Sequence, residues 1–289
     1  MPKDYSKLFP KRPIDAHKHS CGKVGIIAGS INMLGAAVLS ARAALRSGAG
    51  LVYLLTIQES VPYINICYPE LIVLPLPSTK GIISIKALPK IKEYIQEKKF
   101  TALAMGPGLT TEKSIKKIIP ALLKFIYEQK IPTVLDADAL NVLTSADFCD
   151  FTEPNFILTP HLEEFFRFYG QKPNSLLEKQ DFASQLSEKI KQVIVLKGHE
   201  TVIANGVTDS EINPTGNEGM ATAGTGDVLT GIIAGLLAQG LASFDAAILG
   251  TYLHGLAGDL AKEDKTIYGL IASDLIDYLP KVFKLQKVR

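Results

Sequence analysis

The 289-residue chain contains no tryptophan and only three cysteines, and what it lacks excludes several classes of protein. Cys21, Cys67 and Cys149 form no C-x-x-C pair and leave an odd count, so the sequence encodes neither a disulfide framework nor a zinc site. The formal net charge is only +2, and the basic residues are scattered rather than gathered into a nucleic-acid-binding patch. We expect no nucleic-acid partner and a reducing compartment.

Long hydrophobic runs are missing as well. The longest, from Val228 to Ala238, is too short to span a bilayer and is interrupted by Thr230 and by glycines. Residues 1–20 are polar and broken by prolines, without the apolar centre of a secretory signal. These features predict a cytoplasmic protein with no membrane contact.

The composition is that of a soluble globular protein with a large core, because 47% of the residues are hydrophobic and 21% are charged. No proline-, serine- or glycine-rich linker divides the chain, so we expect residues 1–289 to form one domain. Short apolar runs alternate with segments of helical spacing, which predicts an α/β fold with a mainly parallel sheet covered on both faces. The predicted strands begin near residues 23, 50, 101, 132, 155 and 192, and predicted helices cover 35–48, 111–129 and 174–191.

The unusual residues of the chain directly follow the predicted strands. In a parallel sheet the carboxyl ends of the strands share one edge, and ligands bind in the crevice there. We therefore expect these segments to converge on one substrate crevice. They are AGS at 28–30, MGPGL at 105–109, DADALN at 136–141, TPHLEE at 159–164 and KGHET at 197–201.

A cluster of glycines and other small residues at 216–226 precedes Asp227 and a long apolar helix. A helix that begins after glycines presents unpaired N–H groups and the positive end of its dipole, which is typical of an anion site. An acidic residue in a first turn can also act only by stabilising the helix, by about 0.3–1 kcal/mol. The density of glycines favours a functional site, because such a run gives up packing so that the backbone can approach a ligand closely.

Three of the other segments allow two interpretations each. No P-loop and no G-x-G-x-x-G fingerprint occurs, so KGHET is either a plain hairpin turn or a phosphate cradle formed by Lys197 and Gly198. TPHLEE places a proline at the first helical position, with His161 and Glu164 on one helix face. His161 is either a capping residue or a site residue, and Glu164 is a candidate Mg²⁺ ligand, directly or through water. Asp136 and Asp138 either cap a helix or belong to the site.

Taken together, in the order in which they follow one another along the chain, these motifs resemble those of the ADP/ATP-dependent NAD(P)H-hydrate dehydratases over nearly the whole chain. The resemblance implies a ribokinase-like three-layer α/β/α sandwich. It also implies that the chain repairs the S-epimer of hydrated NADH or NADPH: a nucleotide phosphorylates the hydroxyl of the hydrate, phosphate leaves, and the nicotinamide ring is restored. The motifs that carry the resemblance are HKHSCGKVGIIAGS, MLGAAVLSARAALRSGAGLV, AMGPGL, VLDADALN, LTPHLEE, VLKGHETVIA and GNEGMATAGTGDVLTGIIAGLLAQG.

The resemblance also implies roles for individual residues. Asp227 would be the general base that faces the hydroxyl of the substrate, while the amides around Gly224, Thr225 and Gly226 hold the transferring phosphate. Magnesium and Lys197 would offset the repulsion between Asp227 and that phosphate. Contacts to the adenine nucleotide are implied for Lys197, Gly198, His199, Glu200, Thr201 and Gly226, and contacts to the hydrate for Ala36 or Ala37, Gly108, His161 and Asp227.

Two departures from the wider family shape the expected function. Related small-molecule kinases carry Asn where this chain has His161, which favours a dehydratase over a vitamin kinase. Many members carry an epimerase domain ahead of the first strand, whereas only a short arm precedes it here, so we expect a separate epimerase to act with this chain. ADP is favoured over ATP because GNEGMATAGTGD is similar to the bacterial branch, and the resemblance suggests a homotetramer.

Two other functions remain open at this point. The first is a true kinase of a small alcohol such as a hydroxymethylpyrimidine, which would use the same base and anion site but release a stable phosphoester. The second is a non-catalytic subunit that only senses nucleotide; the presence of Lys197, Gly226 and Asp227 speaks against it.

Overall fold

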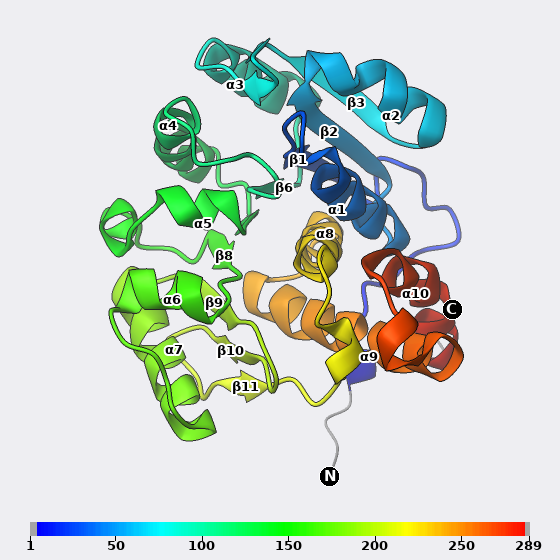
Figure 1. Cartoon of the computed structure of the whole chain (residues 1–289), viewed down its shortest axis with the longest axis vertical. Coiled ribbons are helices and arrows are strands. Elements are labelled where there is room, and N and C mark those ends of the chain that lie inside the picture. Colours follow the sequence, from blue (N-terminus) through cyan, green and yellow to red (C-terminus); the bar gives the residue numbers. More distant parts are fainter. Residues whose placement is uncertain (1–4, 287–289) are drawn as a thin grey trace.

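The strands of the chain form one large sheet and one small hairpin. The computed structural model describes residues 5–286, and in them nine strands make a sheet in the order β11-β10-β9-β8-β7-β6-β1-β2-β3 (Figure 1). Neighbours from β3 to β9 pair in parallel, whereas β10 pairs antiparallel with β9 and β11. The expected α/β fold with a mainly parallel sheet is confirmed. The strands are β1 (Lys23–Ile27), β2 (Leu51–Ile57), β3 (Ile72–Leu76), β6 (Ala102–Met105), β7 (Thr133–Leu135), β8 (Phe156–Leu158), β9 (Val193–Leu196), β10 (Val202–Ala204) and β11 (Glu211–Ile212), with β4 (Ser78–Thr79) and β5 (Ile82–Ile83) in the hairpin.

Helices cover both faces of the sheet, as expected for strands that are apolar on both sides. One core lies between the sheet and α1, α8, α9 and α10, and the other between the sheet and α3 to α7 (Figure 1). Neighbouring residues of β1 alternate between them: Ile26 belongs to the first core and Ile27 to the second. The helices are α1 (Leu34–Arg46), α2 (Val61–Cys67), α3 (Ala87–Lys98), α4 (Ile115–Glu128), α5 (Asp138–Val142), α6 (Leu162–Tyr169), α7 (Leu176–Ile190), α8 (Thr225–Ala238), α9 (Ser243–Gly269) and α10 (Ala272–Leu285).

None of the helices in residues 5–286 combines the length and the apolar character that crossing a bilayer requires.

The switch to antiparallel pairing at β10 follows from the length of the connection. Only residues 197–201 separate β9 from β10, and a parallel neighbour would need a crossover of a dozen or more residues. The KGHET segment is therefore a hairpin turn. This does not exclude the phosphate cradle, because the turn lies at the end of β9 where the other strand-end segments meet.

Close packing of α8 on α1 depends on glycine. A Cβ added at Gly231 would lie 2.1 Å from the carbonyl oxygen of Ser40, and one added at Gly235 would lie 2.1 Å from the hydroxyl of Ser47. No side chain fits in either place, so the absence of side chains is what lets the two helices touch backbone to backbone. This contact fixes the position of the N-terminus of α8 relative to α1.

We predict that Gly231→Ala lowers the free energy of unfolding by about 1–3 kcal/mol, because the added methyl group forces α8 away from α1. Gly35→Ala is the matched control on α1: an added Cβ there meets no atom within 4 Å, and alanine favours the helix. Urea unfolding of both variants measures the difference. Equal stability of the two variants would contradict this account of the packing.

Candidate active site

Main-chain hydrogen bonds join the segments that leave the strand ends. The amide of Gly29, after β1, donates to the carbonyl of Pro107 at 2.8 Å, and the amide of Lys197, after β9, donates to the carbonyl of Pro160 at 2.9 Å. The expected convergence of these segments at one edge of the sheet is confirmed, and the bonds hold their backbones in fixed relative positions.

The N-terminus of α8 is open to a ligand. Gly224 is its N-cap with φ of 91°, and no side chain bonds to the first amides of the helix. A Cβ at Gly224 would lie 2.6 Å from a methyl group of Leu39 on α1, so glycine is required for space as well as for conformation. The amides of Thr225 and Gly226 therefore keep the character of an anion site.

A buried ion pair lies next to this turn. The Lys197 ammonium donates to one carboxylate oxygen of Asp136 at 2.6 Å, and the hydroxyl of Thr230 on α8 donates to the other at 2.7 Å. Asp136 is only 1% exposed. Burial acts to lower the pKa of Lys197, but the carboxylates of Asp136 and Glu164 outweigh it and raise that pKa. Lys197 is thus a fixed, permanently charged group at neutral pH.

Neither aspartate of the DADALN segment acts as a helix cap through its side chain. The N-cap of α5 is Ala137, without a side-chain cap bond. The carboxylate of Asp138 instead accepts from the amide of Thr110 at 2.8 Å and from the side-chain amide of Asn141 at 3.1 Å. The capping interpretation is wrong for both: Asp136 holds Lys197, and Asp138 ties the segment after β6 to the segment after β7.

Gly226 lies directly against the ion pair. A Cβ at this position would be 3.3 Å from the Lys197 ammonium and 3.8 Å from a carboxylate oxygen of Asp136. The structure thus brings together Lys197 and Gly226, which the sequence predicts on the nucleotide side of the site. A side chain at Gly226 would separate the ammonium from anything bound over the first turn of α8.

Asp227, one residue further along α8, is half-buried with a pKa raised to about 7. Burial is the largest cause, and the negative charge of Asp136 adds to it; Lys197 acts in the opposite direction, and Asp138 raises the pKa further. A carboxylate with a pKa near the working pH can both accept and release a proton, as general bases require.

His161 and Glu164 form a reciprocal capping box at the start of α6. The ring nitrogen Nδ1 of His161 accepts from the amides of Glu163 and Glu164, and the Glu164 carboxylate accepts from the amide of His161 at 2.9 Å. Pro160 therefore precedes the N-cap, so its predicted place at the first helical position is wrong. Because Nδ1 accepts hydrogen bonds, the proton of the neutral ring is on Nε2.

The side chain of His161 is nevertheless 53% exposed, so capping leaves the rest of the ring accessible. Burial lowers the pKa of His161, and the positive charge of Lys197 lowers it further, so the ring is neutral at pH 7. Glu164 is 3% exposed, and burial raises the pKa of its carboxyl while Lys197 opposes the shift. Nε2 of the exposed His161 ring lies 3.4 Å from a carboxylate oxygen of the buried Glu164.

A magnesium ion fits this edge of the sheet only in company with a phosphate. Among residues 5–286, no group of three or more His, Cys, Asp or Glu side chains is arranged to hold a metal. Mg²⁺ commonly binds through one or two carboxylates together with substrate phosphates and waters, so an all-protein cage is not required. Glu164 fits an outer position in such a set, because one carboxylate oxygen is already bonded to the His161 amide.

Gly108 packs against the start of α1, next to Ala36. Gly108 has φ of 66°, and a Cβ added to it would lie 2.6 Å from the carbonyl oxygen of Met33 and 3.3 Å from the Cβ of Ala36. Ala37 is fully buried, with its methyl group against Gly29. Of the two alanines, Ala36 is therefore the one that can contact a ligand with its side chain.

Sequence reasoning missed Lys179 on α7, which holds the 197–201 turn in shape. Its ammonium donates to the carbonyls of His199 and Glu200, both at 2.8 Å. Burial lowers the pKa of Lys179 to about 8, and the charge of Glu200 opposes the shift. The signal in the sequence is weak: Lys179 lies on the buried face of α7 with Ala183, where an apolar residue would be expected.

The fold and the site define a protein of the ribokinase-like class. A ribokinase-like superfamily protein from Enterococcus faecalis V583 superposes with a TM-score of 0.81 at 28% identity, over 98% of this chain and 93% of that one. A family model described as NAD(P)H-hydrate dehydratase matches residues 24–281. The chain belongs to the NAD(P)H-hydrate dehydratase family.

Individual relatives agree with this assignment. The ADP-dependent (S)-NAD(P)H-hydrate dehydratase of Bacillus subtilis is 35% identical over 96% of this chain and 94% of its own. A crystal structure of the ADP/ATP-dependent dehydratase from that organism, co-crystallised with ATP and Mg²⁺, gives a TM-score of 0.82 at 32% identity, over 98% of this chain and 96% of its own. The bifunctional NAD(P)H-hydrate repair enzyme of Moorella thermoacetica is 40% identical over 96% of this chain, which spans only 52% of that enzyme.

Proposed function

We propose that this chain catalyses the ADP-dependent dehydration of the S-epimer of hydrated NADH or NADPH, as a single dehydratase domain. The observation that carries the proposal is Asp227: a carboxylate with a pKa of about 7 at an open, glycine-lined helix start. Lys197, at the start of the 197–201 turn, acts electrostatically on this carboxylate, and Gly108 packs against Ala36 near the start of α1. The names of the B. subtilis and M. thermoacetica relatives support the substrate.

In this mechanism Asp227 accepts the proton of the hydrate hydroxyl as that oxygen attacks the terminal phosphorus of ADP. The bond from that phosphorus to AMP breaks, while the first amides of α8 bind the transferring phosphoryl oxygens. The C–O bond of the phosphorylated hydrate then breaks, and a proton leaves the neighbouring ring carbon as the double bond forms. The products are NADH or NADPH, AMP and phosphate.

The nucleotide would lie along the turn of residues 197–201, with Lys197 and Gly226 at its phosphates and Gly198, His199, Glu200 and Thr201 beside it. Lys179 keeps this turn in place through the carbonyls of His199 and Glu200. Magnesium, held by phosphate, water and Glu164, would neutralise phosphate charge. His161 would donate from Nε2 to the hydrate.

We further propose that a separate epimerase supplies the S-epimer, that the protein is cytoplasmic, and that it assembles as a homotetramer. Bifunctional relatives that combine hydrate-repair activities in one chain support the epimerase partner.

The proposal is tested by following absorbance at 340 nm with hydrated NADH and NADPH, each offered with ADP and with ATP. We expect recovery of the reduced nicotinamide, with one free phosphate and, from ADP, one AMP for each molecule repaired. Accumulation of a lasting phosphoester would instead identify a small-alcohol kinase. Absence of turnover with every hydrate and alcohol tested would identify a nucleotide-sensing subunit.

Replacing Asp227, the proposed base, distinguishes a role in catalysis from a role in stabilising the helix. We predict that Asp227→Asn lowers turnover by about 10²–10⁴-fold, the usual contribution of a positioned general base. Binding of ADP should stay equal or become tighter, because a negative charge beside the phosphate disappears. Turnover, ADP affinity and thermal melting are measured on one preparation. Near wild-type turnover would reduce Asp227 to a helix-stabilising residue.

His161 has two roles that a pair of variants separates. His161→Asn keeps a good N-cap but removes the imidazole, whereas His161→Ala removes both. If Nε2 contacts the hydrate, both variants raise the KM for hydrate and leave the KM for ADP unchanged, and only the alanine variant loses about 1 kcal/mol of stability. An asparagine variant with normal KM for hydrate would show that His161 acts only through the start of α6.

A further inference from the structure

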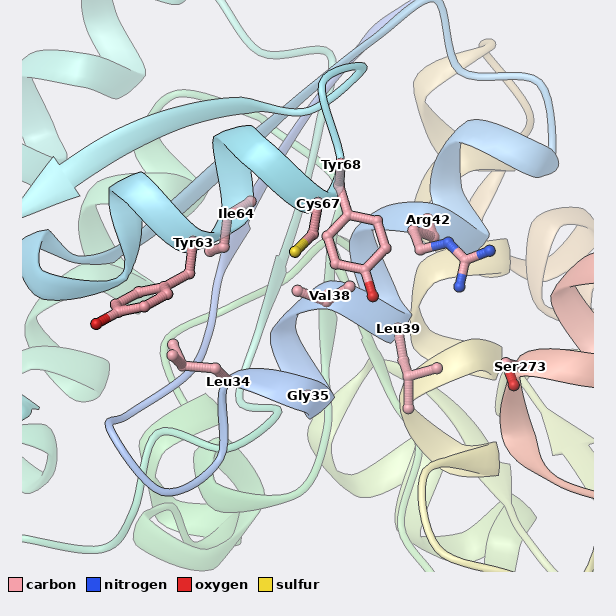
Figure 2. A pocket seen from close by; sticks show the side chains of 10 residues that line it. All are labelled: Leu34, Gly35, Val38, Leu39, Arg42, Tyr63, Ile64, Cys67, Tyr68 and Ser273. Atoms are coloured by element: carbon pink, nitrogen blue, oxygen red, sulfur yellow. The ribbon is translucent and has the colours of Figure 1, made fainter.

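A cavity of about 470 Å³ lies outside the proposed site, between α1, α2 and the start of α10 (Figure 2). Val38 and Leu39 of α1 and Ile64 of α2 give it an apolar wall. Arg42 and Tyr68 stand at one end of it, where the guanidinium lies 5.4 Å from the centre of the tyrosine ring. No step of the proposed reaction uses these residues.

The wall of the cavity adjoins the turn that precedes Asp227. Leu34 and Gly35, which line it, directly precede Ala36 on α1. Leu39 forms part of its wall and is also the side chain against which Gly224 packs. Leu39 therefore separates the cavity from the N-terminus of α8 by the width of one side chain.

The cavity and the turn proposed to bind the nucleotide lie on opposite sides of α8. Figure 1 shows α1 and α2 on one side of α8, and β9, β10 and α7 on the other. The turn proposed for the nucleotide connects β9 to β10, so it lies away from the cavity. Two ligands that meet at the N-terminus of α8 can thus approach from opposite sides.

The lining combines the groups that recognise a phosphorylated aromatic base. Apolar walls and the exposed ring of Tyr63 can cover an aromatic base, and an arginine guanidinium matches phosphate oxygens in a bidentate manner. Arg42 is 3.4 Å from the carboxylate of Asp277, whose side chain is 56% exposed. Such a surface pair is weak, so Arg42 can exchange Asp277 for a phosphate.

We propose that this cavity binds the adenosine half of the dinucleotide hydrate, and that Arg42 pairs with a phosphate of that half. The proposal rests on the proposed function, because it assigns a place to the part of the same substrate that takes no part in the reaction. Arg42 is then a specificity-determining residue: it distinguishes a dinucleotide from a small alcohol that would satisfy Asp227 alone.

The test compares Arg42→Leu with Arg46→Leu, an exposed arginine one turn further along α1 that does not line the cavity. We expect Arg42→Leu to raise the KM for hydrate about 10- to 100-fold, as loss of a charge-assisted contact to phosphate implies, and to leave the KM for ADP and the melting temperature unchanged. Arg46→Leu should change none of these, and Arg42→Lys should lie between wild type and Arg42→Leu. An unchanged KM for hydrate in Arg42→Leu, or an equal rise in Arg46→Leu, overturns the proposal.

A fragment of the substrate keeps the test independent of turnover. Adenosine 2′,5′-bisphosphate should inhibit the wild type competitively against hydrate and not against ADP, and Arg42→Leu should lose this inhibition. Competition with ADP alone would overturn the proposal. If the wild type turns over no hydrate, the proposed function fails; calorimetric binding of the bisphosphate to wild type and to Arg42→Leu then decides separately whether the cavity binds this fragment through Arg42.

Discussion

The buried contact between Asp136 and Lys197 is the interaction on which the rest of the site depends. Burying a carboxylate that is 1% exposed is costly unless it is paired and hydrogen-bonded, and Asp136 has both Lys197 and the Thr230 hydroxyl as partners. These bonds tie the ends of β7 and β9 to the first turns of α8. They also set the electrostatics of Asp227, whose pKa is raised by Asp136 and lowered by Lys197.

Close backbone approach is what lets α8 carry this role. Gly231 allows the helix to touch Ser40 on α1, and Gly224 allows the turn before it to pass Leu39. Side chains at either position would move the first amides of α8 and Asp227 away from Lys197. The glycines of the 216–240 region therefore serve both the core and the site. This explains why these positions hold residues that contribute no side-chain packing.

Much of the fold could be predicted from the sequence, because buried parallel strands are continuously apolar and the unusual residues follow them at once. The segments around Gly108, His161 and Lys197 do converge, and Asp227 does lie at an open helix start. Contacts between side chains that are distant in the sequence could not be predicted in the same way, because no local pattern marks the partners. The place of Lys179 on the buried face of α7 does not reveal that its partners are carbonyls of the 197–201 turn. The partners of Asp136 come from segments 61 and 94 residues further along the chain. Pro160 lies two positions before the first helical residue, not at it, because His161 itself caps α6.

The most direct test of this account is the titration of Asp227 itself, followed by ¹³C NMR of the aspartate carboxyl groups and assigned by the signal missing from Asp227→Asn. The account predicts that Asp227 titrates with a pKa of about 7 in the wild type. In Asp136→Asn the pKa should fall, because a neighbouring negative charge is lost and Lys197 remains positive. A pKa near that of an ordinary aspartate in the wild type, or no change in Asp136→Asn, would contradict the claim that the buried ion pair tunes the proposed base.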